Sequence, residues 1–127
     1  MRDIKQILII DDDSFMRVLL SHTLEDLTEQ NIELLMASNG NKGLELALSE
    51  RPALIFLDVM MPGLNGFQVC RQIKEADDQI YIIMLTAKGR ATDREQGKMA
   101  GADEYITKPF DPDYILKRTV EILGLEP

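Results

Sequence analysis

The sequence predicts an α/β domain in which a five-stranded, doubly wound parallel sheet carries helices on both faces. Short, continuously apolar runs alternate along the chain with stretches of helical periodicity, which is typical of repeated strand–helix–strand units. The length of 127 residues fits one domain, residues 1–127, and the apolar share of 45% is enough to form a hydrophobic core. Right-handed crossovers between the five units would keep the strands parallel.

The first half of the chain contains two predicted strands and two predicted helices. A strand over Ile7–Ile10 is apolar throughout, as expected when both of its faces are buried. A helix from about Ser14 to Leu27 carries an apolar stripe at helical spacing. A second strand follows over Ile32–Ala37, and a turn at Asn39-Gly40 leads to a second helix that ends before Pro52.

The second half of the chain continues the alternation with three strands and three helices. Asn65 is available to cap the third helix, and Asp111-Pro112 marks the start of the last one because proline favours the first helical turn. The predicted strands are Leu54–Leu57, Ile80–Leu85 and Glu104–Thr107, and the helices begin after Gly66, run over Ala91–Met99 and begin after Asp111.

The most informative polar residues directly follow predicted strands. Asp11–Asp13 follow the first strand, Asp58 the third, Thr86 the fourth and Lys108 the fifth. Parallel strands all point the same way, so these positions share the carboxyl edge of the sheet, where open α/β sheets bind ligands. We therefore expect these side chains to converge although they are far apart in the sequence.

The chemistry of this set points to phosphoryl transfer. Carboxylates as close as Asp11, Asp12 and Asp58 would raise each other's pKa, and a hard cation such as Mg²⁺ would relieve their repulsion. The metal and Lys108 would offset the charge on a phosphoryl group, the hydroxyl of Thr86 would orient one of its oxygens, and a carboxylate would attack in line.

These residues resemble the receiver domain of bacterial two-component response regulators, and the chain is similar to single-domain chemotaxis-type receivers. The resemblance covers nearly the whole chain and rests on four motifs in order: Asp11-Asp12, Asp58-Val59-Met60-Met61-Pro62 with Gly66, Thr86-Ala87, and Lys108-Pro109-Phe110. Each motif is weak alone, but their order on successive strand ends is specific. The resemblance implies a flavodoxin-like strand order, 2-1-3-4-5.

The resemblance also implies a role for each acidic residue. Asp58 would accept a phosphoryl group from the phosphohistidine of a histidine kinase or phosphotransfer protein. Asp12, Asp58 and the backbone carbonyl of Met60 would bind Mg²⁺ directly, and Asp11 would act largely through a water molecule. The domain would catalyse only its own phosphorylation and slow dephosphorylation, so it would be a signalling domain and not a classical enzyme.

The remaining motif residues would sense and transmit the change. Lys108 would pair with a phosphoryl oxygen, and its bond to Pro109 would be cis. Thr86 would turn toward the phosphoryl group and Tyr105 would move inward with it. The result would be an altered surface on the fourth helix, fifth strand and fifth helix, which would contact an output partner. Five basic residues fall on these helices, with a solvated face as the plain alternative: Arg90, Arg94, Lys98, Lys117 and Arg118.

Composition restricts the partners and the compartment. A net charge of −8 argues against nucleic acid or an anionic membrane as a direct partner. No apolar stretch approaches the ~20 residues that span a bilayer, and no signal peptide is recognisable, so we expect a cytoplasmic protein. The single cysteine, Cys70, reads as a buried apolar residue, and the single histidine, His22, as a solvated one. The sequence leaves open a homodimer, and it leaves open a stand-alone receiver or a piece of a longer regulator.

Three other functions compete with the phosphorylation switch. Asp11-x-Asp13 also resembles the start of a haloacid-dehalogenase-type phosphatase, but a second acidic metal motif and room for a cap are missing. A flavodoxin-like electron carrier would need a hydroxyl- and glycine-rich loop where three aspartates stand. A receiver scaffold that is not phosphorylated usually lacks one of the acids, the threonine or the lysine.

Overall fold

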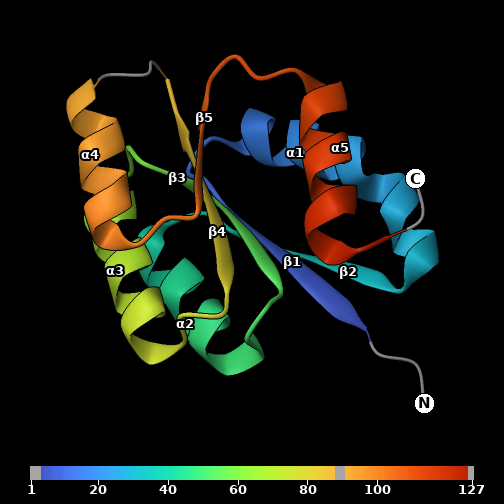
Figure 1. The fold of residues 1–127 in the computed structure, drawn as a ribbon, viewed down its shortest axis with the longest axis horizontal. Helices are drawn as coiled ribbons and strands as arrows, with labels where there is room; N and C mark the ends of the chain where they lie inside the picture. Colours follow the sequence, from blue (N-terminus) through green and yellow to red (C-terminus); the bar gives the residue numbers. More distant parts are fainter. Residues whose placement is uncertain (1–3, 88–90, 126–127) are drawn as a thin grey trace.

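The computed structural model describes residues 4–87 and 91–125 and confirms the predicted parallel sheet (Figure 1). All neighbouring strands are parallel. The strands are β1 (Lys5–Ile10), β2 (Ile32–Ala37), β3 (Leu54–Asp58), β4 (Tyr81–Thr86) and β5 (Glu104–Thr107). Their order is β2-β1-β3-β4-β5, as the resemblance implied. The chain therefore adds β2 on one side of β1 and the later strands on the other side.

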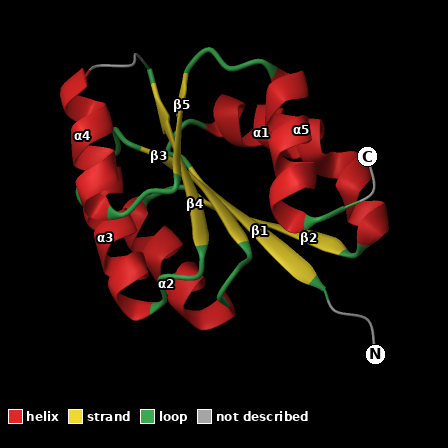
Figure 2. Ribbon diagram, viewed as in Figure 1, coloured by secondary structure: helices red, strands yellow, loops and turns green. Residues whose placement is uncertain are grey.

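Helices cover both faces of the sheet (Figure 2). They are α1 (Ser14–Leu24), α2 (Gly40–Glu50), α3 (Gly66–Ala76), α4 (Ala91–Ala100) and α5 (Pro112–Leu123), with a short 3₁₀ helix, η1 (Glu25–Gln30), after α1. Helices α1 and α5 pack on one face over a core that includes Ile7, Phe56 and Ile115. Helices α2, α3 and α4 lie on the other face, over a core that includes Leu8 and Ile73.

The first helix ends earlier than predicted, and this part of the prediction was wrong. The α-helix stops at Leu24, and the chain continues to Gln30 as 3₁₀ helix. The hydroxyl of Thr28 donates a hydrogen bond to the carbonyl of Glu25 at 2.6 Å, and such local bonds compete with the α-helical pattern. Asn31 then takes a left-handed conformation (φ 64°), which asparagine tolerates better than most residues.

Side-chain caps explain where four of the helices begin. Asp13 accepts from the backbone of Phe15 at the start of α1, and Asp111 accepts in the same way at the start of α5. Asn65 forms a reciprocal capping box with Gln68, which confirms its predicted role. Asn39, predicted only as a turn residue, is the N-cap of α2. Each of these caps fixes a helix directly behind the carboxyl edge of the sheet, where the site lies.

Within the described part of the chain, none of the helices is both long enough and apolar enough to cross a bilayer.

Candidate functional site

Three carboxylates meet at the carboxyl edge of the sheet, as predicted from the strand ends. Asp11 and Asp12 follow β1, and Asp58 is the last residue of β3. Strands β1 and β3 are hydrogen-bonded neighbours, so these residues are brought together although 46 positions separate Asp12 from Asp58. One carboxylate oxygen of each residue lies within 4.8 Å of the others. Asp11 and Asp58 are buried and Asp12 is exposed, so the cluster opens to solvent on the Asp12 side.

Hydrogen bonds hold both the carboxylate and the backbone carbonyl of Asp11. Its Oδ1 accepts a hydrogen bond from the backbone of Asp13 at 2.9 Å, and its own carbonyl accepts from the Arg17 guanidinium at 2.7 Å. Sequence reasoning did not find Arg17. The only signal was a basic residue in the helix after the acidic run, and helical position alone does not reveal that its side chain reaches back to the end of β1.

Lys108 provides the positive charge of the cluster. Its Nζ lies 3.1 Å from Oδ2 of Asp11 and 3.3 Å from Oδ1 of Asp58, and the lysine side chain is only 18% exposed. The following peptide bond, Lys108–Pro109, is cis, as the resemblance implied. The backbone N–H of Lys108 donates to the carbonyl of Thr86, which joins the ends of β5 and β4.

The electrostatics of the cluster are unfavourable for three ionised carboxylates. Burial raises the pKa of Asp58 from 3.8 to about 6, with a further upward contribution from Asp11, and Lys108 only partly offsets the rise. Burial lowers the pKa of Lys108, but the attraction of Asp58 and Asp11 outweighs it, so the lysine stays protonated. The site therefore has more negative charge than its own lysine neutralises, and an additional cation would stabilise it.

Thr86 lies on β4, the neighbour of β3, and Tyr105 lies on β5, the edge strand beyond it. Thr86 is buried at the end of β4 and is paired in register with Thr107 of β5. Tyr105 is half-buried in β5, and its ring packs beside Gly97 of α4, with the Arg94 guanidinium 6.0 Å above the ring centre. The structure thus connects the strand end at the acidic cluster to the α4 side of the molecule through neighbouring strands.

Gly66 sets how closely α3 approaches the acidic cluster. A Cβ atom at this position would lie 2.3 Å from the carbonyl oxygen of Asp58 and 2.8 Å from the Cα of Val59. Only glycine permits this approach without a shift of the backbone that carries Asp58. Met60, two residues after Asp58, is 73% exposed, and the role of its carbonyl stays a prediction.

The other polar residues considered from the sequence lie away from the cluster. His22 is exposed beside Glu25, and Cys70 is buried with its thiol 3.5 Å from the carbonyl of Ala100, so both predictions are confirmed. Of the five basic residues, Arg118 is paired with Glu104 at 2.9 Å, and Lys117 borders a groove between η1 and α5. Arg90 lies outside the described residues.

Residues 7–120 match the response regulator receiver domain. The chain belongs to this family. As a receiver domain it is a phosphorylation-dependent signalling switch, a phosphoacceptor and not a classical enzyme, and Asp11, Asp12 and Asp58 form an acidic site. This supports the switch over the phosphatase and the electron carrier.

Curated relatives of this receiver domain are longer proteins. It is 40% identical over 119 residues to the alkaline phosphatase synthesis transcriptional regulatory protein PhoP of Bacillus subtilis, which covers 94% of this chain and 48% of that protein. It is 43% identical over 118 residues to the transcriptional regulatory protein SrrA of Staphylococcus aureus, covering 93% of this chain and 47% of that protein. The chain therefore spans about half the length of these relatives.

Solved structures show the same receiver fold. The BeF3-activated DrrB receiver domain has a TM-score of 0.85 at 31% identity, covering 96% of this chain and 99% of that one. The chemotaxis protein CheY4 of Vibrio cholerae has a TM-score of 0.83 at 30% identity, covering 94% of this chain and 99% of that one.

Proposed function

We propose that Asp58 accepts a phosphoryl group from a phosphohistidine of a histidine kinase or phosphotransfer protein. The observation that carries the proposal is the position of Asp58 at the end of β3, among two other carboxylates and 3.3 Å from the Lys108 ammonium. Asp11 is fixed by hydrogen bonds to both of its carboxylate oxygens, and Asp12 is exposed at the rim. Asp58 is buried and contacts the lysine through its Oδ1.

The donor set fits Mg²⁺. Every ligand atom that the cluster offers is a carboxylate oxygen, and hard oxygen ligands suit this ion. Asp12 and Asp58, with the backbone carbonyl of Met60, would hold the ion directly, and Asp11 would hold it through water. When bound, Mg²⁺ supplies positive charge for the phosphoryl oxygens, in addition to the charge of Lys108.

The transfer itself is a displacement at phosphorus. A carboxylate oxygen of Asp58 attacks the phosphorus atom, the new P–O bond forms as the P–N bond to the donor histidine breaks, and the imidazole keeps the electron pair. Lys108 pairs with one phosphoryl oxygen and Thr86 donates its hydroxyl to another. The product is an acyl phosphate on Asp58, and its added charge and acceptor oxygens change the balance at the edge of the sheet.

The proposed readout is the surface formed by α4, β5 and α5. Thr86 is paired in register with Thr107, two residues from Tyr105 on the same strand, and the Tyr105 ring packs beside Gly97 of α4. A movement of Thr86 toward the phosphoryl group would therefore change the packing of Tyr105 and with it the α4 surface. We propose that an output partner or domain, or a second copy of the chain, reads this surface in the cytoplasm.

The test is phosphorylation with a small-molecule phosphodonor, followed by intact-mass measurement. With Mg²⁺ the protein is expected to gain ~80 Da, the mass of one phosphoryl group. The adduct should be absent from Asp58→Asn and present in Asp78→Asn, a matched change at an exposed aspartate far from the cluster. An adduct of equal size and yield in Asp58→Asn, or none in the wild type, would overturn the assignment.

A further inference from the structure

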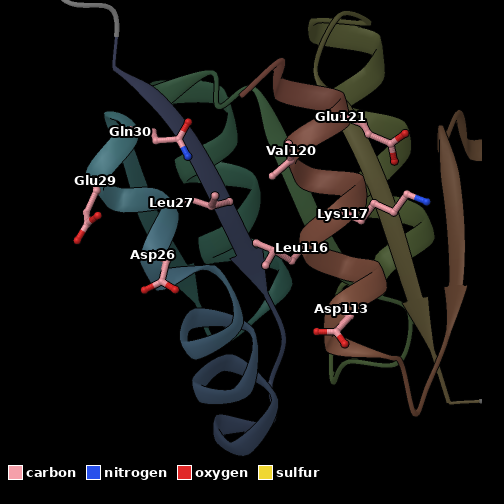
Figure 3. Close-up of a pocket in the computed structure, with 9 residues that line it drawn as sticks. All are labelled: Asp26, Leu27, Glu29, Gln30, Asp113, Leu116, Lys117, Val120 and Glu121. Atoms are coloured by element: carbon pink, nitrogen blue, oxygen red, sulfur yellow. The ribbon is translucent and has the colours of Figure 1, made fainter. Parts of the chain in front are cut away.

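A groove of about 850 Å³ lies between η1 and α5, on the sheet face opposite α3 and α4 (Figure 3). Its floor is apolar and is formed by Leu27 of η1 with Leu116 and Val120 of α5. Figure 3 shows Leu27 and Leu116 facing each other across it. Leu116 and Val120 are only partly buried, and they extend the core under α1 and α5 to the surface.

The groove lies beside the segment that follows α1 in the chain. Helix α1 packs against α5, whereas η1 packs against α1 and β2. The chain changes to 3₁₀ helix at Glu25, and the groove lies between this segment and α5, with helical backbone on both sides.

The borders of the groove are strongly acidic. Asp26 and Glu29 lie along η1, and Asp113 lies at the end of the groove formed by the first turn of α5. Salt bridges within the described residues do not involve these three carboxylates. Glu121 and Lys117 both project from the flank of α5 that faces away from η1, and Glu121 is paired with Arg118 at 3.6 Å.

We propose that this groove docks a basic amphipathic helix of a partner protein. Apolar side chains of the helix would lie on Leu27, Leu116 and Val120, and its Lys and Arg side chains would reach the acidic borders. Leu116 and Val120 are four residues apart on α5, a rise of ~6 Å, which matches the i, i+4 spacing of anchors on a docked helix.

Charge selects this occupant over the alternatives. A second copy of the chain would bring another protein of net charge −8 and, in a symmetric pair, the same acidic borders against each other. Nucleic acid and anionic lipid would be repelled by the same carboxylates. A helix with an apolar stripe flanked by Lys and Arg satisfies both the floor and the borders, and this surface is separate from the acidic cluster at Asp58.

The probe is a synthetic helical peptide of ~14 residues with a leucine stripe flanked by lysines, long enough for a helix to form on binding. Its affinity for the unphosphorylated full chain is measured by fluorescence anisotropy, and its site by amide chemical shifts in NMR spectra. We expect the shifts to concentrate on η1 and α5. A peptide of the same pattern with glutamate in place of lysine should not bind.

Matched variants separate the groove from the overall negative charge. The triple variant Asp26→Asn/Glu29→Gln/Asp113→Asn should bind the lysine peptide at least ~10-fold more weakly. Glu45→Gln/Glu75→Gln/Glu95→Gln, which removes three exposed acids elsewhere, should change the affinity less than ~2-fold. Leu116→Ala/Val120→Ala should also weaken binding. If these two changes at the edge of the core disturb folding, the triple variant of Asp26, Glu29 and Asp113 still decides the test.

Three outcomes would overturn the proposal. Equal weakening by both triple variants would show attraction to bulk charge only. Chemical-shift changes outside η1 and α5 would place the peptide elsewhere. Sedimentation of the wild type as a dimer that Leu116→Ala/Val120→Ala converts to monomer would assign the groove to a second copy of the chain.

Discussion

The ammonium group of Lys108 lies 3.3 Å from Oδ1 of Asp58, across 50 positions of sequence. Asp58 is the last residue of β3 and Lys108 directly follows β5, and β4 lies between these two strands. The lysine reaches over the end of β4 to form this contact and also touches Asp11. Burial raises the pKa of Asp58 and the contact with Lys108 lowers it, so the charge state of Asp58 depends on Lys108.

The raised pKa of Asp58 predicts a pH-dependent gain in stability for Asp58→Asn. With its pKa at about 6 in the folded state and 3.8 as its ordinary value, Asp58 favours folding at low pH. This contribution is fully present below pH ~4 and is lost as pH rises through ~6. At pH 8 without Mg²⁺ the ionised carboxylate is therefore destabilising by up to ~3 kcal/mol.

Asparagine removes this charge but also the partner of Lys108, so we expect a net gain of ~1–2 kcal/mol in the free energy of unfolding at pH 8. The gain should vanish below pH ~4, where Asp58 is protonated. Urea unfolding across this pH range in the presence of a chelator measures it. A gain of the same size at every pH would contradict the assigned cause.

Mg²⁺ is expected to stabilise the wild type and not Asp12→Asn. A ligand that binds only the folded state stabilises it by ~1.4 kcal/mol at about ten times its dissociation constant. Asp12 is exposed, so its replacement should leave the metal-free stability almost unchanged while it removes a proposed ligand. Thermal unfolding with and without Mg²⁺ tests this. An equal rise in Tm in both proteins would exclude Asp12 as a ligand.

Removal of Lys108 should destabilise the metal-free protein, and part of this effect should depend on the charge of Asp58. In Lys108→Met, two buried carboxylates lose their counter-charge, at a cost of ~1–3 kcal/mol at pH 8. The cost should be smaller in the Asp58→Asn background, and a double-mutant cycle measures the difference. Lys98→Met, at an exposed lysine of α4, is the matched control and should have little effect. Additive effects of the two changes would mean that the contact is not energetically coupled.

Gly66→Ala should impair both stability and phosphorylation. The added methyl group would lie 2.3 Å from the carbonyl oxygen of Asp58, so the backbone that carries the acceptor must shift, and we expect a loss of ~2–4 kcal/mol. Gly63→Ala is the control. It places a methyl group in open space at a positive φ of 75°, so it should cost only ~1 kcal/mol and leave the phosphorylation rate unchanged. Similar phosphorylation rates for both variants would contradict the close-approach argument.

The convergence of the site could be predicted from the sequence because it follows from topology. Asp11, Asp58 and Lys108 each follow a parallel strand, so their meeting at one edge needs no knowledge of side-chain packing. The contacts themselves could not be predicted in this way. The bond from Arg17 to the Asp11 carbonyl depends on a rotamer of a long side chain, and no periodicity in the sequence encodes it.

The end of the first helix was missed for a related reason. Leu27 continues the apolar stripe of α1 and is buried, so the pattern of burial was read correctly while the backbone type was not. An apolar stripe records which residues face the core, and α-helical and 3₁₀ backbone can both satisfy it over one turn. Residues of η1 line the groove beside α5, so the predicted continuous helix did not reveal this groove.

The backbone hydrogen bond from Lys108 to the Thr86 carbonyl has a mechanical consequence. It joins the residue that would grip the phosphoryl group to the residue that would respond to it, through the main chain of two adjacent strands. No loop lies between the two hydrogen-bonded groups, so a displacement of the backbone at Lys108 would displace the backbone at Thr86 as well. Binding of a phosphoryl group by Lys108 and the response of Thr86 would therefore be mechanically coupled.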